Sequence, residues 1–308
     1  MKNSYTNFHY PNQHLPRTDL ACESVDCESS GEGNFYREYK TFGIPVSELI
    51  IGEGVGEASA GRKAGRYVTV RTPVMRYLSE DEKNRLIGVI SCELITFTEK
   101  ISNKPVGPKT KVLVAGLGNR FISADSIGPR TADKIAVTGH VMGSDTKNVF
   151  DELGCSSISC VHPGVMGQTG IEAAAMIKGA AEYVRPDVII AVDALAARAT
   201  KRLCSTIQLC DTGIEPGSGI GNRRGGVNIE TVGFPVIALG VPTVVDCATL
   251  VFDTLSKSGI CNLEDELDSA LSEERSFFVS LRDSDIVSEE ISSILAGAIN
   301  RAFLTEGL

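Results

Sequence analysis

The sequence predicts an α/β fold, with a mainly parallel central sheet flanked by helices and a smaller N-terminal β-hairpin region. The main observation is an alternation that begins at residue 111, where short apolar runs alternate with amphipathic runs of helical period. Strands that alternate with helices form parallel sheets that are covered on both faces. The composition agrees with a globular protein that has a substantial core, because 42% of the 308 residues are hydrophobic and 22% are charged.

The N-terminal third of the chain predicts an arm, a hairpin and a helix. Residues 1–35 are polar and aperiodic, which is typical of a flexible arm. Residues 44–72 contain two strand-like runs, IPVSELII and RYVTVRT, and the glycine-rich stretch between them indicates a hairpin with a long loop. Residues 79–100 have a helical pattern, and residues 103–109 then form a linker.

Strands and helices are expected in alternation after residue 111. The predicted strands are KVLVAGLG (111–118), SISCVHPG (157–164), DVIIAVDA (187–194), CSTIQLC (204–210) and PVIALGVP (235–242). The predicted helices are a helix that begins in IGPRTADKIAVTGHV (127–141), then GIEAAAMIKGAAEYVR (170–185), TVVDCATLVFDTL (243–255) and residues 283–303. In the second of these helices one face carries the apolar side chains Ala173, Ala174, Ile177, Ala181 and Val184.

The composition argues against several classes of function. A net charge of −9 disfavours direct binding to nucleic acid or to an anionic membrane. The nine cysteines are scattered without a CxxC pair, which is typical of reduced thiols. No apolar run approaches the roughly 20 residues that a membrane span needs, and the N-terminus lacks the apolar segment of a signal peptide. We therefore expect a cytoplasmic protein.

Two aspartates are expected at one edge of the sheet. Asp193 follows the apolar run of a predicted strand, and Asp125 lies in the loop 116–129 after another strand. Ligand sites of parallel sheets lie at the carboxyl ends of the strands. Two acids held close share a proton, so one can activate water while the other protonates an oxyanion or leaving nitrogen. The alternative is that Asp125 caps a helix and that Asp193 caps its strand.

Other chemistries have weaker support in the sequence. The GLGN turn could bind a nucleotide, but Phe121 stands where the third glycine of a dinucleotide fingerprint belongs. A metal would need a third ligand, usually histidine, and all four histidines precede Asp193: His9, His14, His140 and His162. There is no GxSxG motif for a serine nucleophile, and the cysteines lie in apolar surroundings.

The glycine-rich loop 216–226 carries two arginines, Arg223 and Arg224. It lacks the GK[ST] ending of a phosphate-binding loop. We expect either a mobile surface loop or a flap over a peptide groove, whose arginines attract acidic flanks of the substrate.

Several motifs in one order resemble the germination protease family of spore-forming bacteria. They are RTDLACES, VLVAGLGNRFISADSIGP, HPGVMGQTGIEAA, IIAVDALAARA, DTGIEPGSGIGNRRGG and GVPTVVDCATL, and together they span nearly the whole chain. The resemblance departs in two places. The loop reads SADSIGP where relatives carry proline before the aspartate and alanine after it, and the region 255–280 is shorter than in longer relatives.

The resemblance implies an endopeptidase that initiates degradation of small acid-soluble spore proteins during germination. It places the two catalytic aspartates of an atypical aspartic mechanism at Asp125 and Asp193, with no cofactor and no metal. It also implies a zymogen that removes its own N-terminal segment. In RTDLACES we expect the cut between Asp19 and Leu20, so that residues 1–19 are the pro-segment and residues 20–308 a single α/β peptidase domain. The family further implies a homotetramer in the cytoplasm of the forespore, later the spore core.

Two alternatives remain open from the sequence. GLGN followed by an acid and IGP is also similar to the nickel-hydrogenase maturation peptidases, in which the corresponding acids and a downstream histidine bind metal. A nucleotide- or nucleoside-binding protein that uses the GLGN turn is the other alternative.

We predict that peptidase activity survives EDTA, because no histidine follows Asp193 to complete a metal site. The measurement is hydrolysis of a spore-protein substrate with and without the chelator. Loss of activity on chelation, with recovery when one metal is added back, would favour the maturation-type mechanism instead.

Overall fold

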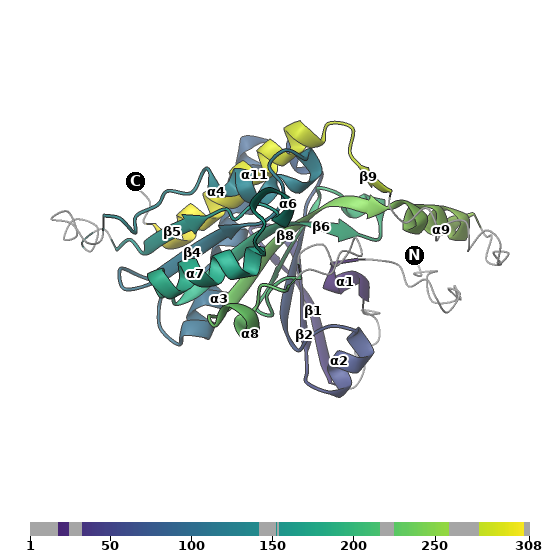
Figure 1. The fold of residues 1–308 in the computed structure, drawn as a ribbon. Coiled ribbons are helices and arrows are strands. Elements are labelled where there is room, and N and C mark those ends of the chain that lie inside the picture. The colour runs from purple at the N-terminus through teal and green to yellow at the C-terminus, as the bar shows by residue number, and fades with distance from the viewer. Residues whose placement is uncertain are drawn as a thin grey trace.

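The computed structural model describes residues 18–24, 33–141, 152, 154–215, 225–258 and 277–304. Within these ranges the strands form one nine-stranded mixed sheet in the order β1-β2-β3-β7-β8-β6-β4-β5, with β9 paired to β8 (Figure 1). The strands are β1 (Asn34–Thr41), β2 (Ile44–Ile51), β3 (Gly65–Arg71), β4 (Lys111–Gly116), β5 (Ser157–Val161), β6 (Val188–Ala197), β7 (Thr206–Cys210), β8 (Val236–Asp246) and β9 (Phe278–Ser280).

The sheet has a parallel core and antiparallel extensions. The β5-β4-β6-β8 strands pair in parallel, which confirms the predicted α/β class. The N-terminal strands join the same sheet, because β3 pairs antiparallel with β7, and β7 pairs antiparallel with β8. The predicted hairpin is formed by β2 and β3.

Strand β1 lies outside the predicted hairpin and begins within the expected arm. It pairs with β2 from Asn34 to Thr41, and the turn between them is Phe42-Gly43. Both turn residues have positive φ, as the tight turn of a two-residue hairpin requires. The residues of β1 are mostly polar and partly exposed on both faces of the strand. Such a strand lacks the apolar run that identifies a buried strand in the sequence.

Helices cover both faces of the parallel core (Figure 1). The longer helices are α3 (Glu80–Ser102), α7 (Ala173–Val184), α9 (Cys247–Lys257) and α11 (Ser284–Phe303), and the shorter ones are α1 (Ala21–Ser24), α2 (Val55–Ala60), α4 (Ile127–Ala132), α6 (Met166–Thr169) and α8 (Ile229–Val232). Side chains of β6 alternate between the faces: Ile190 packs with α3, α4 and α11, whereas Ile189 packs with α7 and α8. None of the described helices is long and apolar enough to cross a membrane.

Two predicted helices differ from the observed elements. The helix that begins at residue 127 ends at Ala132, because the chain then turns to the edge of β5, where the amides of Thr138 and Gly139 both donate to the Ile158 carbonyl. The run expected as a helix from residue 243 begins as strand, because β9 pairs with β8 as far as Asp246. The other predicted helices are confirmed with small shifts at their ends.

A buried ion cluster ties the N-terminal strands to α3. Arg66 of β3 donates to Glu48 of β2 at 2.5 Å and to Glu93 of α3 at 2.8 Å. Burial by itself would raise the pKa of Glu48, but hydrogen bonds from Arg66 and Arg37 lower it below its usual range. The guanidinium also lies over the Phe97 ring. These contacts compensate the cost of burying the three charges.

Helix α4 begins in direct backbone contact with the end of β4 and the middle of β6. A Cβ atom on Gly128 would lie 2.1 Å from the Leu117 carbonyl oxygen and 2.5 Å from the Val192 carbonyl oxygen. A Cβ atom on Gly116 would lie 2.4 Å from the Gly128 carbonyl oxygen. The Leu117 amide also donates to the Val192 carbonyl at 2.8 Å. Only glycine fits at both positions, so the loop between β4 and α4 is held against β6 at Val192.

We predict that Gly128→Ala destabilises the protein by about 1–3 kcal/mol or more, because the new methyl group forces the backbone apart. Gly179→Ala is the matched control, since Gly179 is exposed on α7 with open space around it. The control should be neutral or stabilise by up to about 1 kcal/mol, as expected for glycine to alanine within a helix. Urea unfolding of both variants checks this, and equal midpoints would contradict the close contact at Gly128.

Candidate active site

Asp125 and Asp193 line one cavity of about 380 Å³. Asp125 ends a 3₁₀ turn, Ser123–Asp125, between β4 and α4. Asp193 lies in β6 and is 4% exposed. Strand β4 pairs with β6 only as far as Val192, so Asp193 lies just beyond the pairing with β4, although β6 continues beside β8 to Ala197. The structure therefore brings the two sequence-predicted acids to one site.

The loop around Asp125 is held by hydrogen bonds from several elements. The Asn119 amide donates to Asp125 Oδ2 at 2.8 Å. Gly118 has a φ of 107°, and a Cβ atom there would lie 2.2 Å from the Asp125 carbonyl oxygen. Thr243 of β8 donates to the Ala124 carbonyl at 2.6 Å, and Ser288 of α11 donates to that of Ser123 at 2.7 Å. The GLGN turn thus positions the Asp125 carboxylate through the backbone amide of Asn119.

The capping alternatives do not describe these two acids. The N-cap residue of α4 is Ser126, whose side chain makes no capping hydrogen bond. Asp193 lies within β6 and accepts a hydrogen bond from the Ala194 amide at 2.9 Å. Neither carboxylate therefore serves as a cap, and both line the cavity.

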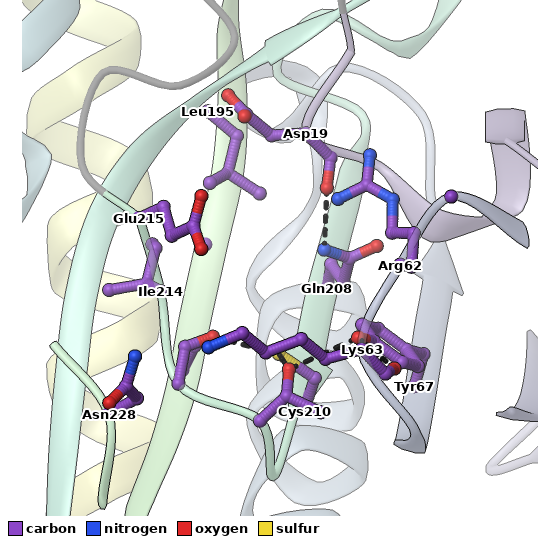
Figure 2. Close-up of a pocket in the computed structure, with 15 residues that line it drawn as sticks. Asp19, Arg62, Lys63, Tyr67, Leu195, Gln208, Cys210, Ile214, Glu215 and Asn228 are labelled. Atoms are coloured by element: carbon purple, nitrogen blue, oxygen red, sulfur yellow. Dashed lines mark hydrogen bonds between the residues drawn. The ribbon is translucent and has the colours of Figure 1, made fainter. Parts of the chain in front are cut away.

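The cavity also holds a segment of the N-terminal region. The Asp19 amide donates to the Ala196 carbonyl at 2.8 Å, and the Ala196 amide donates to Asp19 Oδ2 at 2.8 Å. Figure 2 shows Gln208 below Asp19, where its Nε2 donates to the Asp19 carbonyl at 3.0 Å. Asp19 lines the cavity with Asp125 and Asp193. The expected flexible arm is therefore an ordered part of the site at residues 18–24.

The residues after Asp19 are buried. Leu20 is fully buried against apolar side chains that include Leu195, Leu203 and Val245. Ala21 is also fully buried, and its amide donates to Gln208 Oε1 at 2.6 Å. The sequence does not single out Gln208, because one polar residue in a buried strand has no recognisable motif. Its burial in the apolar run CSTIQLC is the signal that could have identified it.

A second cavity, of about 170 Å³, shares the lining residues Asp19 and Leu195 with the first. Figure 2 shows Arg62, Lys63, Tyr67 and Glu215 around it, and Asp19 lines both cavities. Arg62 donates to the Thr18 carbonyl at 2.7 Å, so a cation of the α2–β3 loop also holds the segment.

The other groups considered in the sequence analysis are the two arginines, a metal site and the cysteines. Arg223 and Arg224 lie outside the described residues, while Gly225, which follows them, lines the cavity of the two aspartates. Among the described residues no group of three or more His, Cys, Asp or Glu side chains is arranged to hold a metal. Burial raises the pKa of the Cys160 thiol to about 11 and that of Cys204 to about 12, so both are poor nucleophiles at neutral pH.

The fold and the site define an α/β protein with an aspartate-lined cleft that holds a peptide segment. The sequence profile described as germination protease matches residues 18–260. The germination protease of Bacillus subtilis (strain 168) is 38% identical over 252 residues, which cover 79% of this chain and 67% of that protein. Those of Caldanaerobacter subterraneus and Oceanobacillus iheyensis are 39% and 41% identical, covering 78% of this chain and 72% and 66% of their own lengths. The chain belongs to the germination protease family, which is a family of peptidases.

Proposed function

We propose that this protein is an endopeptidase that initiates the degradation of small acid-soluble spore proteins during germination. Membership of the germination protease family supports the activity. The observation that carries the proposal is the peptide segment at residues 18–24, whose Asp19 lies in the cavity lined by Asp125 and Asp193. A protein that cuts peptides needs such a cleft beside its catalytic groups.

The proposed mechanism uses the two aspartates as an acid and a base. One ionised carboxylate accepts a proton from the water that attacks the scissile carbonyl. The other, protonated carboxyl group donates to the carbonyl oxygen, and the proton on the base is then delivered to the leaving nitrogen. Burial of Asp193 and the fixed loop of Asp125 hold the groups in place before the substrate binds. No step requires a cofactor.

We also propose that the chain is made as a zymogen with residues 1–19 as its pro-segment. The Asp19 carbonyl and the buried Leu20 side chain lie on either side of the bond that would be cut. Leu20 and Ala21 fill apolar space that a substrate could otherwise enter. An uncut segment in this place would therefore block the cleft, and after the cut the freed residues 20–24 have to leave it before a substrate binds. From the family we further propose a homotetramer that acts in the spore core, without direct binding to nucleic acid or membrane.

Asp125→Asn and Asp193→Asn should each reduce hydrolysis of a spore-protein substrate by about 10²-fold or more, because a carboxylate in proton transfer contributes that much. Asp81→Asn is the matched control, since Asp81 is an exposed acid in the first turn of α3. Turnover is measured on variants whose thermal unfolding matches wild type. Near-normal turnover in either folded site variant would remove that residue from catalysis.

The zymogen should cut itself between Asp19 and Leu20, giving a chain that begins at Leu20. Tethering makes this cleavage effectively unimolecular when the segment fits the cleft. Burial of Leu20 disfavours trimming by an unrelated protease, which needs an accessible segment. Mass spectrometry of purified zymogen at mildly acidic pH checks the cut. A new N-terminus elsewhere, or the same cut in Asp193→Asn with no other protease present, would contradict self-processing.

A further inference from the structure

A second carboxylate site lies beyond the catalytic cavity, and Glu23 of the chain's own N-terminal segment occupies it. The Arg198 amide donates to Glu23 Oε2 at 2.7 Å, and the Ala199 amide donates to Oε1 at 3.1 Å. Arg202 Nε lies 3.0 Å from Glu23 Oε1, so the two side chains form an ion pair. The Glu23 side chain is 6% exposed and that of Arg202 is 19% exposed. This is a built site for one anionic group.

The register of the segment is fixed by Gln208. Its side chain donates to the Asp19 carbonyl and accepts from the Ala21 amide, so it holds the backbone on both sides of Leu20. Leu20 is fully buried, which prevents the segment from sliding. With this register, the side chain that reaches the carboxylate site is always the fourth residue after Asp19. The position of the acid relative to Asp19 is therefore set by geometry.

The carboxylate site and a catalytic acid belong to one continuous stretch of chain. Strand β6 carries Asp193 and then Ala196, which pairs with Asp19, and the turn that follows β6 supplies the amides of Arg198 and Ala199. Arg202 ends the 3₁₀ turn Thr200–Arg202 immediately afterwards. A peptide held by this stretch is therefore aligned with Asp193 at the same time as its acid is bound.

We propose that Arg202, together with the amides of Arg198 and Ala199, determines specificity by binding an acidic side chain four residues C-terminal of the cleaved bond's Asp or Glu. This inference rests on the proposed peptidase function. The net charge of −9 repels acidic peptides in general, so a local cation is needed to select them. A neutral glutamine side chain at this position loses the charge pair, and a lysine side chain places two cations together.

The first experiment needs no enzyme variant. In the processed protein residues 20–24 have a free N-terminus, and the proposal requires that they leave the site so that Glu23 is replaced by the acid of the substrate. This protein is given the peptide of residues 16–25, PRTDLACESV, in reducing buffer, beside versions with Glu23→Gln and Glu23→Lys. We expect KM to rise about tenfold or more for the glutamine peptide, as for loss of a hydrogen-bonded charge, with kcat nearly unchanged. The lysine peptide should be cut still less efficiently.

The second experiment assigns the effect to Arg202. Arg202→Gln should abolish the preference for the glutamate peptide over the glutamine peptide, and Arg202→Glu should favour the lysine peptide. Lys201→Gln is the matched control, because Lys201 is an exposed cation on the same turn. The control removes the same charge and should keep the preference for glutamate. The conservative variant Arg202→Lys should restore part of it.

Different results would contradict the role of Arg202 and the proposed function. If the processed protein cuts all three peptides with equal kcat/KM, or if Lys201→Gln loses the preference as fully as Arg202→Gln, the role of Arg202 is wrong although the protein is a peptidase. The role of Arg202 is also wrong if spore proteins are cut and none of the peptides is. If neither spore proteins nor peptides are cut by the processed protein, the proposed function itself fails.

Discussion

The candidate site depends on one steric constraint, the backbone contact of Gly128 with Leu117 after β4 and with Val192 in the middle of β6. Because a Cβ atom there would lie 2.1 Å from the Leu117 carbonyl oxygen, α4 can start against the sheet only with glycine at this position. That contact decides where the loop before α4 runs. The loop then places Asp125 above Gly118, with its carboxylate on the Asn119 amide. If α4 were held away from the sheet by a side chain at this position, the loop would lose its backbone contact with Leu117 and Val192.

The unequal lengths of the parallel strands create the cleft. Pairing between β4 and β6 stops at Val192, whereas pairing between β6 and β8 continues to Ala197. The second half of β6 therefore has backbone groups that can bind an added peptide. Asp19 uses them, with its amide on the Ala196 carbonyl and its carboxylate on the Ala196 amide. One strand thus supplies both a buried carboxylate and a surface for peptide binding.

Two clusters of buried charges in the described part of the chain are compensated by neighbouring groups. Glu48 and Glu93 share Arg66 behind the N-terminal strands, and Glu23 is bound by amides and Arg202 beside the cleft. The first cluster joins strands to a helix and has a structural role. The second holds a segment whose Asp19 lines the cavity of Asp125 and Asp193, so the same physical arrangement there is suited to binding a peptide.

The sequence by itself determined the α/β class, the parallel core and the two acids. Apolar runs such as Ile189–Val192 alternate with amphipathic helices strongly enough to identify buried strands, and Asp193 is expected at the end of such a strand, although β6 continues to Ala197. The family resemblance added the catalytic roles expected of Asp125 and Asp193 and the expected position of the cut. Local patterns carry this information because burial and helical period act over a few residues.

Only the tertiary structure decided that β1 joins the sheet, that the helix beginning at Ile127 is short, and that Asp19 of the segment 18–24 lines the cavity of the two aspartates. A polar segment such as RTDLACES reads as a flexible arm because its partners lie far away in the sequence. Gln208 and Arg202 are separated from that segment by more than half of the chain, and no local period records the contact. Long-range pairing of this kind depends on strand order and register, which only the folded sheet fixes.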